Sequence, residues 1–312
     1  MAADTHVERL AIVDWGDHPC PPDHLRDHLA DLDCDVVVRD PADVDDCDAA
    51  VTVYHHDEFV GAVDWVHTIR SGYEDFPLDA YEERGITLTN STGIAGDLVA
   101  ESALGLMLSL AKGFHRFRDR QQDADWRRLP WDRPFELGAQ SVCVVGLGAI
   151  GASVATRASV LGMDVWGVDV RPVSALDLGH VYDVNRIRDA VADARFVVLT
   201  TPLSESTRGL VDETVFEAMR EDAYLVNVSR GEIVDQDALV AALQTDEIAG
   251  AALDVFETEP LPEDSPLWAM ENVVVTPHAA AQSDNYGEKV ADLVATNARL
   301  LGTDRDPWNR IV

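Results

Sequence analysis

The chain has 312 residues, of which 46% are hydrophobic, and its 57 acidic residues against 24 basic ones give a net charge of -33. This length predicts two domains, each large enough to bury a core of its own. The acidic excess is spread along the chain and repels nucleic acid and anionic membranes at low salt, so we expect neither as a partner.

The basic residues include only two lysines, Lys112 and Lys289. A surface rich in Asp and Glu and poor in Lys is similar to that of proteins from extreme halophiles, where molar salt screens the self-repulsion. A general adaptation for solubility is the plainer interpretation of the same composition.

The N-terminal sequence lacks the basic start and unbroken apolar core of a signal peptide, so none is expected. The most apolar stretch, 98–110, is interrupted by Glu101, which favours a buried helix over a membrane span. The cysteines lack metal-ligand spacing, and we interpret them as reduced thiols of a cytoplasmic protein without a metal site. They are Cys20, Cys34, Cys47 and Cys143.

Short apolar runs in the first part of the chain predict strands at 10–14, 36–38, 50–53, 65–69 and 86–89. A polar-faced helix is expected at 23–32. Strands that alternate with helices predict a parallel sheet with helices on both faces. This region lacks a glycine fingerprint, so we expect it to hold the substrate rather than a nucleotide.

A long helix is predicted from Asp97, whose side chain can cap it, to about Phe117. The segment 118–135 follows and is rich in arginine and tryptophan, including Trp126 and Trp131. No periodic pattern buries these rings locally. A subunit interface and packing on the segment's own domain are therefore equally compatible with it.

The segment 141–171 has the pattern strand, glycine turn, helix and strand, opening with the β-branched run 142–145. The turn contains Gly146, Gly148 and Gly151. In such a unit the first glycine makes the tight turn, the second lets the backbone approach a pyrophosphate, and the third lets the helix lie close on the strand. Asp169, about 20 residues further on, is placed to bond a ribose diol. These features together predict a dinucleotide-binding unit.

The rest of the chain continues the α/β pattern. Strands are predicted at 196–200, 224–228, 249–253 and 273–275, with helices at 187–191, 212–219 and 236–243. A final helix, 284–301, has polar and apolar sides and could return to pack on the first domain.

Three polar residues, Arg230, Glu259 and His278, follow apolar runs of this second half. Taken singly, each fits a bland role: a surface ion pair, one acid among many, or a core imidazole. Doubly wound sheets bind ligands at the carboxyl ends of their strands, where all three are expected. Together with the motifs around them, they form a constellation that is known from one enzyme family.

The motifs that contain these residues are VNVSRGEIVDQDAL, AGAALDVFETEPLP and NVVVTPHAA, in this order after VVGLGAIG. In spacing, order and local residues the chain resembles the D-isomer-specific 2-hydroxyacid dehydrogenases, as an acidic member of haloarchaeal type. The resemblance implies two Rossmann-like doubly wound parallel-sheet domains. A cofactor domain, 97–283, would be inserted in a substrate domain, 1–96 plus 284–312, and closure would use hinges near 94–97 and 281–284.

The resemblance assigns roles to the three polar residues. His278 would be the general acid that protonates the carbonyl oxygen as hydride reaches C2, and the base in oxidation. Glu259 would hold the imidazole and favour its charged form. Arg230 would bind the carboxylate and carbonyl with its planar fork. The expected substrate is a small anionic 2-oxo or 2-hydroxy acid.

The resemblance also implies that the substrate carboxylate meets backbone N–H groups of a loop in the first domain. The matching residues are Arg70, Ser71, Gly72 and Tyr73. Many relatives carry smaller residues after this glycine. Tyr73 could therefore narrow the substrate pocket, point to solvent or pack on the hinge.

On the cofactor side, Asp169 favours a 2′-hydroxyl and hence NAD, whereas Arg171 could clamp the 2′-phosphate of NADP. NAD(H), NADP(H) or both are expected. Thr201 and Pro202 should flank the adenosine half, and Asp254 should bond the nicotinamide amide. The other contacts expected, besides the three glycines, are Ala149, Ile150, Val228, His278 and Ala280.

The implied function is stereospecific, NAD(P)H-dependent reduction of 2-oxo acids to D-2-hydroxy acids by a cytoplasmic homodimer. A glyoxylate or hydroxypyruvate reductase is the alternative within this class. An NAD(H)-sensing, corepressor-like interaction protein is the alternative from another class. The acidic surface and the intact set of Arg230, Glu259 and His278 argue against the sensing role.

Overall fold

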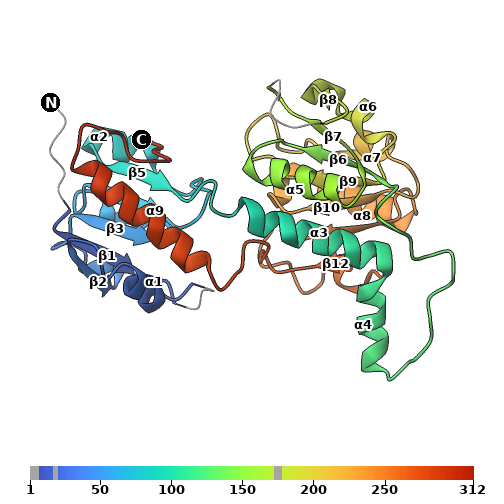
Figure 1. The fold of residues 1–312 in the computed structure, drawn as a ribbon, viewed down its shortest axis with the longest axis horizontal. Coiled ribbons are helices and arrows are strands. Elements are labelled where there is room, and N and C mark those ends of the chain that lie inside the picture. Colours follow the sequence, from blue (N-terminus) through green and yellow to red (C-terminus); the bar gives the residue numbers. More distant parts are fainter. Residues whose placement is uncertain (1–6, 17–19, 172–177) are drawn as a thin grey trace. The chain divides into compact units, whose positions relative to one another are not determined.

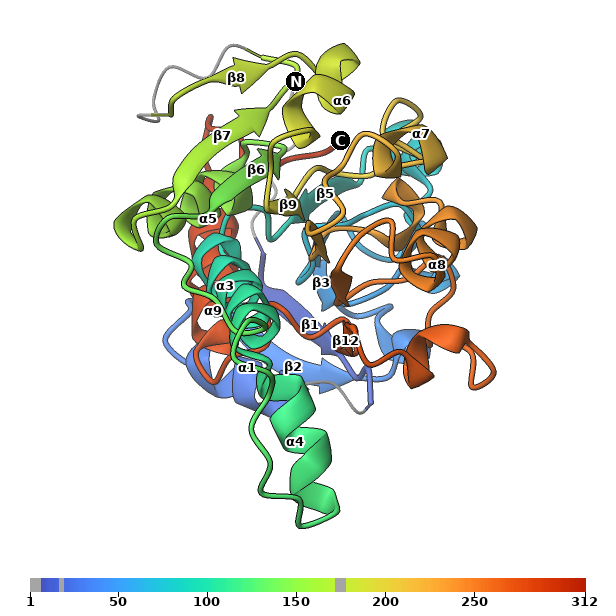
Figure 2. The ribbon, with the colours of Figure 1, turned by 90° about the vertical axis from the view of Figure 1, so that its right-hand side faces the viewer.

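The computed structural model describes residues 7–16, 20–171 and 178–312. The chain forms two compact units: unit 1 comprises Met1–Ala95 and Gln282–Val312, and unit 2 is Gly96–Ala281. Each unit has its own parallel sheet flanked by helices (Figure 1; Figure 2). The expected fold class, two doubly wound α/β domains, is confirmed. Among the described residues, none of the helices combines the length and apolar character needed to cross a membrane.

In the described part of unit 1, the sheet has five parallel strands in the order β2-β1-β3-β4-β5. They are β1 (Arg9–Val13), β2 (Asp35–Arg39), β3 (Ala49–Thr52), β4 (Trp65–Thr68) and β5 (Thr87–Asn90). Each begins and ends close to its predicted span. The apolar runs of β3 and β4 are fully buried, as in the middle of a parallel sheet, whereas the edge strand β2 is partly exposed. The strand order reverses between β1 and β3, which is the switch point where such sheets bind ligands.

Helices cover both faces of this sheet. They are α1 (Pro22–His28), α2 (Leu78–Arg84) and α9 (Tyr286–Leu301). On one face Leu25 and Leu29 pack with Val290 and Val294 of α9 against the strands. On the other face Tyr81 of α2 belongs to a second apolar cluster. The last helix thus returns to the first unit, as its amphipathic pattern predicted.

In unit 2, the described residues form seven parallel strands in the order β12-β11-β10-β9-β6-β7-β8. They are β6 (Ser141–Val145), β7 (Asp164–Val168), β8 (Val181–Tyr182), β9 (Phe196–Leu199), β10 (Tyr224–Asn227), β11 (Gly250–Leu253) and β12 (Val273–Val275). The order reverses between β6 and β9. The segments that leave the carboxyl ends of these two strands therefore diverge, which makes room for a ligand.

One face of this second sheet is covered by α3 (Gly96–Lys112) and α5 (Ala149–Val160), which pack on each other (Figure 1). The helices on the other face are α6 (Ile187–Val191), α7 (Glu213–Phe216) and α8 (Gln236–Gln244). Their buried residues Ile187, Val215 and Leu239 share one apolar cluster with the strands. The core of unit 2 therefore fixes the sheet edge on which the expected site lies.

Helix α3 ends at Lys112, so the single helix predicted to reach about Phe117 is wrong. Gly113 has a φ of 68°, in the left-handed region. A Cβ on Gly113 would lie 2.3 Å from Cδ1 of Leu129, which packs over it. The chain restarts as α4 (Phe114–Gln122), which extends away from the sheet of unit 2 (Figure 1).

The segment after α4 has irregular structure and returns to the sheet at Phe135. The Phe135 ring stacks on Tyr224, with the ring centroids 5.9 Å apart. Trp126 and Trp131, in contrast, are 100% and 93% exposed. The end of this segment therefore packs on its own unit. Such packing does not account for Trp126 and Trp131, because both side chains are exposed.

Candidate active site

The three glycines that follow β6 meet different steric constraints. Gly146 has a φ of 92°, and a Cβ there would lie 2.8 Å from the Cα of Thr201. A Cβ on Gly151 would lie 1.9 Å from the carbonyl oxygen of Gly146, because α5 packs against the turn. A Cβ on Gly148 would meet no atom within 4 Å in the described structure. The turn is therefore tight at both ends and open in the middle, where a pyrophosphate would approach.

Helix α5 begins at Ala149, directly after this open glycine. Ala149 is exposed and Ile150 is half-buried. The backbone N–H groups in the first turn of a helix lack partners within the helix, and the helix dipole adds partial positive charge there. The start of α5 can therefore hold a phosphate group of a dinucleotide.

Asp169 follows β7 and faces the same turn. One carboxylate oxygen accepts the backbone N–H of Leu147 at 2.8 Å, and the other accepts that of Arg171 at 2.9 Å. The Asp169 side chain is 6% exposed, whereas that of Arg171, with its Nε 3.6 Å from Oδ1 of Asp169, is 74% exposed. Asp169 thus braces the glycine turn from within, and Arg171 lies outside it.

The carboxyl end of β9 is joined to the glycine turn across the switch point. The Thr200 hydroxyl donates to the carbonyl oxygen of Gly146, with 2.6 Å between the oxygens. Thr201 and Pro202 follow directly. Val228 follows β10 and is buried. The structure therefore brings these three residues, all expected at the cofactor, to the same sheet edge.

The imidazole of His278 is paired with the carboxylate of Glu259. Nδ1 of His278 lies 2.8 Å from Oε2 of Glu259, and the two side chains are 50% and 35% exposed. Oε1 of Glu259 accepts the backbone N–H of Phe256 at 3.0 Å. The carboxylate is thus held from two sides, and Nε2 of His278 remains as the ring atom that can exchange a proton with a substrate.

The pKa of Glu259 lies below its ordinary value. Burial alone would raise this pKa, but the hydrogen bonds from His278 and the Phe256 N–H, together with the charges of His278 and Arg230, outweigh burial. The carboxylate is therefore ionised at neutral pH. An ionised carboxylate stabilises a protonated imidazole beside it, which suits a general acid.

The backbone of His278 has a φ of 51°, in the left-handed region. Such a conformation in a residue other than glycine must be imposed by its surroundings. Asp254, 1% exposed, imposes it through both carboxylate oxygens. Oδ1 accepts the Thr276 hydroxyl at 2.6 Å and the Ala279 N–H at 2.9 Å, and Oδ2 accepts the Ala280 N–H at 2.9 Å.

Sequence reasoning missed this bracing role of Asp254. The signal was an acid at the end of a buried strand, but 57 acidic residues hide such a signal. The expected bond from Asp254 to the nicotinamide amide stays a prediction. Ala280, also expected at the cofactor, is buried, and its carbonyl accepts the hydroxyl of Ser102 on α3.

Arg230 follows β10 and is held close to the segment that carries Glu259. A Cβ on the next residue, Gly231, would lie 1.8 Å from the carbonyl carbon of Phe256. Only glycine permits the two segments to approach this closely. Nη1 of Arg230 donates to the Ser229 carbonyl at 2.8 Å. Its charge acts on Glu259, so the structure brings the three expected catalytic residues together in unit 2.

The expected substrate loop lies in unit 1, directly after β4. Ser71 is exposed, Gly72 is buried and Arg70 is half-buried. Tyr73 packs against the apolar cluster that contains Tyr81. Its partly buried ring therefore packs on the core of unit 1, a position that was not among those considered for Tyr73.

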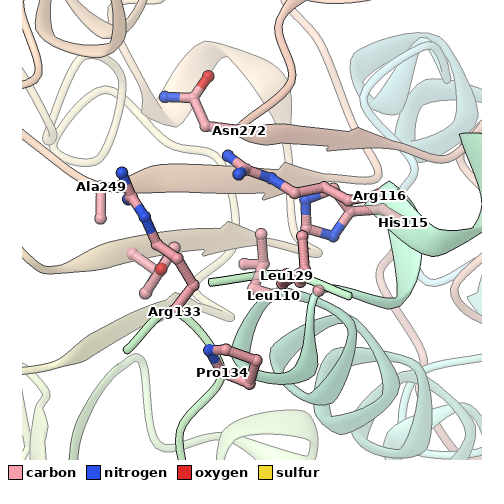
Figure 3. Close-up of a pocket in the computed structure, with 10 residues that line it drawn as sticks. Leu110, His115, Arg116, Leu129, Arg133, Pro134, Ala249 and Asn272 are labelled. Atoms are coloured by element: carbon pink, nitrogen blue, oxygen red, sulfur yellow. The ribbon is translucent and has the colours of Figure 1, made fainter. Parts of the chain in front are cut away.

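Unit 2 also has a cleft among residues that precede the strands of its sheet (Figure 3). It is lined by Arg116 and Arg133, beside Tyr224, Ala249 and Asn272. The last three residues lie at the amino ends of β10 to β12, so the cleft is on the sheet edge opposite His278. Within the described ranges, no group of His, Cys, Asp and Glu side chains could hold a metal ion.

Comparison with known proteins points to one family. The model of the D-isomer specific 2-hydroxyacid dehydrogenase NAD binding domain matches residues 104–280. A glyoxylate reductase of Korarchaeum cryptofilum is 35% identical over 246 residues, which cover 77% of this chain and 73% of the relative.

Solved structures of similar fold cover nearly the whole chain. A D-isomer specific 2-hydroxyacid dehydrogenase of Xanthobacter autotrophicus, in complex with NADPH and MES, has a TM-score of 0.82 at 27% identity and 98% coverage of both chains. An NADPH-dependent glyoxylate/hydroxypyruvate reductase of Sinorhizobium meliloti, in complex with citrate, has a TM-score of 0.84 at 25% identity, covering 97% of this chain and 98% of its own.

The glycine turn, the braced histidine and these matches lead to one conclusion: the chain belongs to the D-isomer-specific 2-hydroxyacid dehydrogenases, and residues 104–280 form the NAD-binding domain of this family of oxidoreductases.

Proposed function

We propose that the protein reduces small 2-oxo acids to D-2-hydroxy acids with a reduced nicotinamide dinucleotide. The observation that carries this proposal is the pair of His278 and Glu259, 2.8 Å apart, on the sheet edge that also presents the glycine turn. A carbonyl reductase needs a general acid that takes up a new proton after each turnover, and it needs a binding site for the dinucleotide.

When bound, the dinucleotide supplies the hydride that attacks the carbonyl carbon, C2. The open backbone at Gly148 and the start of α5 would hold its phosphates. Nε2 of His278 would donate the proton that the carbonyl oxygen takes up, so a C–H and an O–H bond form as the C=O double bond becomes single. Glu259 would stabilise the imidazolium before this transfer, and Arg230 would hold the substrate carboxylate.

Within this class we propose glyoxylate and hydroxypyruvate as the first substrates to test. The names of the Korarchaeum and Sinorhizobium relatives support this choice. In unit 1, the loop Arg70, Ser71, Gly72 and Tyr73 would bind the carboxylate through its backbone N–H groups. Two-carbon and three-carbon oxo acids place little bulk beyond that carboxylate.

For the cofactor we propose use of both NADH and NADPH. The carboxylate of Asp169 already accepts hydrogen bonds from two backbone N–H groups, so it has less capacity left to bind a ribose diol. The guanidinium of Arg171 is largely exposed and could meet a 2′-phosphate. The variant Arg171→Ala is expected to raise KM for NADPH and leave KM for NADH within about twofold.

We also propose a homodimer built on an arm, defined here as residues 114–135. The arm carries six arginines against four aspartates in a chain whose net charge is -33. It also presents Trp126 and Trp131 almost fully exposed. A basic, aromatic surface of this kind is complementary to the acidic surface of a second copy.

The arm is tested by the variant with Trp126 and Trp131 both changed to Ala, followed by light scattering during gel filtration. The expected result is a monomer, while Trp308→Ala, which removes another exposed tryptophan, stays dimeric. A parent protein that is monomeric at micromolar concentration would contradict the dimer.

We also propose that the protein is salt-adapted and of haloarchaeal type, which its acidic, lysine-poor composition supports. We propose a cytoplasmic location because the four cysteines are interpreted as reduced thiols. Screening by molar KCl would relieve the self-repulsion of the acidic surface. We therefore expect the unfolding midpoint to rise between 0.1 M and roughly 2 M KCl. An unfolding midpoint that does not change with KCl would exclude this adaptation.

The experiment that tests the reaction measures nicotinamide oxidation in molar KCl, with NADH and NADPH, against 2-oxo acids of increasing side-chain length. His278→Ala and Arg230→Ala are compared with the parent. Turnover that both changes abolish supports the reductase. Nucleotide binding without turnover of any oxo acid would instead favour a nucleotide-sensing protein.

A further inference from the structure

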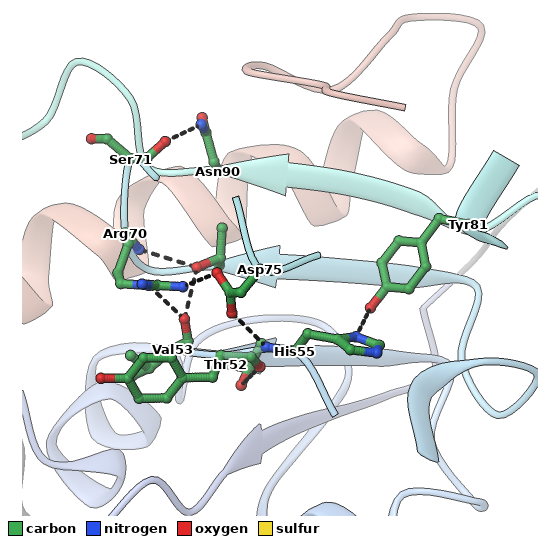
Figure 4. Close-up of polar contacts among 10 residues, drawn as sticks. Thr52, Val53, His55, Arg70, Ser71, Asp75, Tyr81 and Asn90 are labelled. Atoms are coloured by element: carbon green, nitrogen blue, oxygen red, sulfur yellow. Dashed lines mark hydrogen bonds and ion pairs between the residues drawn. The ribbon is translucent and has the colours of Figure 1, made fainter. Parts of the chain in front are cut away.

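The side chain of Arg70 lies in the loop that we propose for the substrate carboxylate. An arginine in such a loop invites the interpretation that its guanidinium binds the anion directly. The contacts of this guanidinium lead to another role (Figure 4). Its Nε donates to the carbonyl oxygen of Val53 at 2.7 Å, and its Nη2 is paired with Oδ1 of Asp75. Its central carbon lies 4.7 Å from the centre of the Tyr54 ring.

These contacts close the loop on itself and on the end of β3. Arg70 and Asp75 lie five residues apart, at the two ends of the loop. The second oxygen of Asp75 accepts the backbone N–H of His55 at 3.1 Å. Val53 and His55 both follow β3, so the pair fastens both ends of the loop to the same neighbouring segment.

The other side of the loop is fastened to the end of β5. The side-chain amide of Asn90 donates to the Ser71 carbonyl at 2.7 Å, and the backbone N–H of Ser91 donates to the Arg70 carbonyl at 2.9 Å. The carbonyl groups of Arg70 and Ser71 are thereby occupied. With its carbonyls bound to one strand end and its terminal side chains to another, the loop has few ways to reorient its N–H groups.

We propose that Arg70 is a positioning residue: with Asp75 and the Val53 carbonyl it forms a latch that holds the Ser71 to Tyr73 backbone ready for a carboxylate. This inference rests on the proposed function. An isolated ion pair at about one-third exposure contributes little. A planar guanidinium that meets a carboxylate, a carbonyl and a ring at once fixes geometry as a lysine ammonium cannot.

The latch predicts a specific kinetic pattern. Without it, bound substrate must order the loop, so Arg70→Met and Asp75→Ala should each raise KM for the oxo acid roughly tenfold, with kcat within about twofold. The double variant should be no worse than either single one, because both remove the same device. KM for the dinucleotide should not change, since unit 2 binds it. Arg70→Lys should recover part of the loss.

A direct substrate ligand predicts the opposite for Asp75. Removal of Asp75 would release the guanidinium for the anion, so KM for the oxo acid would stay or fall while Arg70→Met raised it. Either that result, or additive losses in the double variant, overturns the latch. Arg26→Met is the matched control, because Arg26 also pairs with an aspartate of unit 1, on α1. It should leave both KM values unchanged.

Amide hydrogen exchange of the holoenzyme provides a readout independent of turnover. The latch predicts faster exchange at residues 71–73 in Asp75→Ala than in the parent or in Arg26→Met. Unchanged exchange there overturns the latch, whatever the kinetics. A parent that reduces none of the oxo acids refutes the proposed function and with it the carboxylate role, while this exchange result still decides whether the latch exists. If Arg70→Met does not fold, Arg70→Lys and Asp75→Ala are sufficient for both measurements.

Discussion

Each unit of this protein contains a partly exposed carboxylate that is paired with a nitrogen-containing side chain. Glu259 pairs with His278 in unit 2, and Asp75 pairs with Arg70 in unit 1. The side chains are similarly accessible, but the bases differ. Imidazole exchanges its proton near neutral pH, whereas guanidinium keeps its charge at every pH that a protein survives. The same kind of pair can therefore supply a proton in unit 2 and only rigidity in unit 1.

The largest effect is expected where the base itself is removed. His278→Gln keeps a polar side chain, but its amide cannot release a proton near neutral pH, so kcat should fall by ~10² to ~10⁴. The dissociation constant of NADH, measured by fluorescence titration, should stay within about threefold because the glycine turn is intact. A variant that retains most of its kcat would remove His278 from the mechanism.

The next effect tests the charge of the carboxylate in the pair. Glu259→Gln can still accept from Nδ1 of His278 but no longer stabilises an imidazolium, so kcat should fall on the order of 10²-fold at pH 7. Because the pKa of Glu259 is below its ordinary value, its carboxylate stays charged as pH falls through the ordinary carboxyl range. Its contribution should therefore be present at pH 5 and vanish only at lower pH.

A pH series separates the charge of Glu259 from simple damage to the fold. Because the variant no longer stabilises the imidazolium, the ratio of parent kcat/KM to variant kcat/KM should be larger at pH 7 than at pH 5. A ratio that is the same at both pH values would mean that Glu259 does not act through the charge of the imidazole.

A smaller loss of kcat is expected when the support of the 276–280 segment is changed rather than His278 itself. Asp254→Asn loses the charge that three donors of the 276–280 segment share. We expect about tenfold lower kcat from misplacement of His278 and roughly 2 kcal/mol lower unfolding free energy. Asp235→Asn, at the N-cap of α8, is the control, because asparagine caps nearly as well as aspartate. Equal effects of the two changes would contradict the bracing role.

The smallest effect on kcat is expected for a histidine whose hydrogen-bond partners are uncharged. His67 is fully buried, between the hydroxyls of Thr89 and Ser91 at 2.8 and 3.0 Å. Burial lowers its pKa to about 3. The unfolded chain binds the proton first, so this residue should reduce stability as pH falls from about 6.5 toward 3.

The measurement is the unfolding free energy of parent and His67→Gln at pH 7 and pH 5. The parent should lose about 2 kcal/mol more than the variant over this interval, with little change in kcat. His180→Gln, which removes an exposed histidine, should match the parent. Parallel pH slopes for all three proteins would show that His67 does not titrate in this way.

Much of the framework could be predicted because its strands are apolar, β-branched runs. The break after α3 could not, since a lone glycine in a helix costs only about 1 kcal/mol and is often tolerated. The helix breaks at Gly113, where the side chain of Leu129, sixteen residues away, occupies the space that a Cβ would need. Such contacts between distant residues are not visible in local periodicity.

The candidate site divides in the same way. The expectation for Arg230, Glu259 and His278 came from motifs with fixed spacing, and the contacts between them are local to one sheet edge. The bracing contacts of Asp254 and the contacts of Asp75 could not be predicted, because no motif indicates which donors an aspartate meets in the folded chain. Their donors come from segments that only the folded chain brings together.

Gly231 sets a boundary for anyone who wishes to redesign this protein. Any side chain there would overlap the backbone at Phe256, so Arg230 and the segment leading to Glu259 are locked in one arrangement. Arg230, the proposed anchor of the substrate carboxylate, and Glu259, the proposed support of His278, therefore cannot be shifted independently of each other. Attempts to accept larger oxo acids should therefore vary the loop of unit 1 and leave this part of unit 2 as a fixed template.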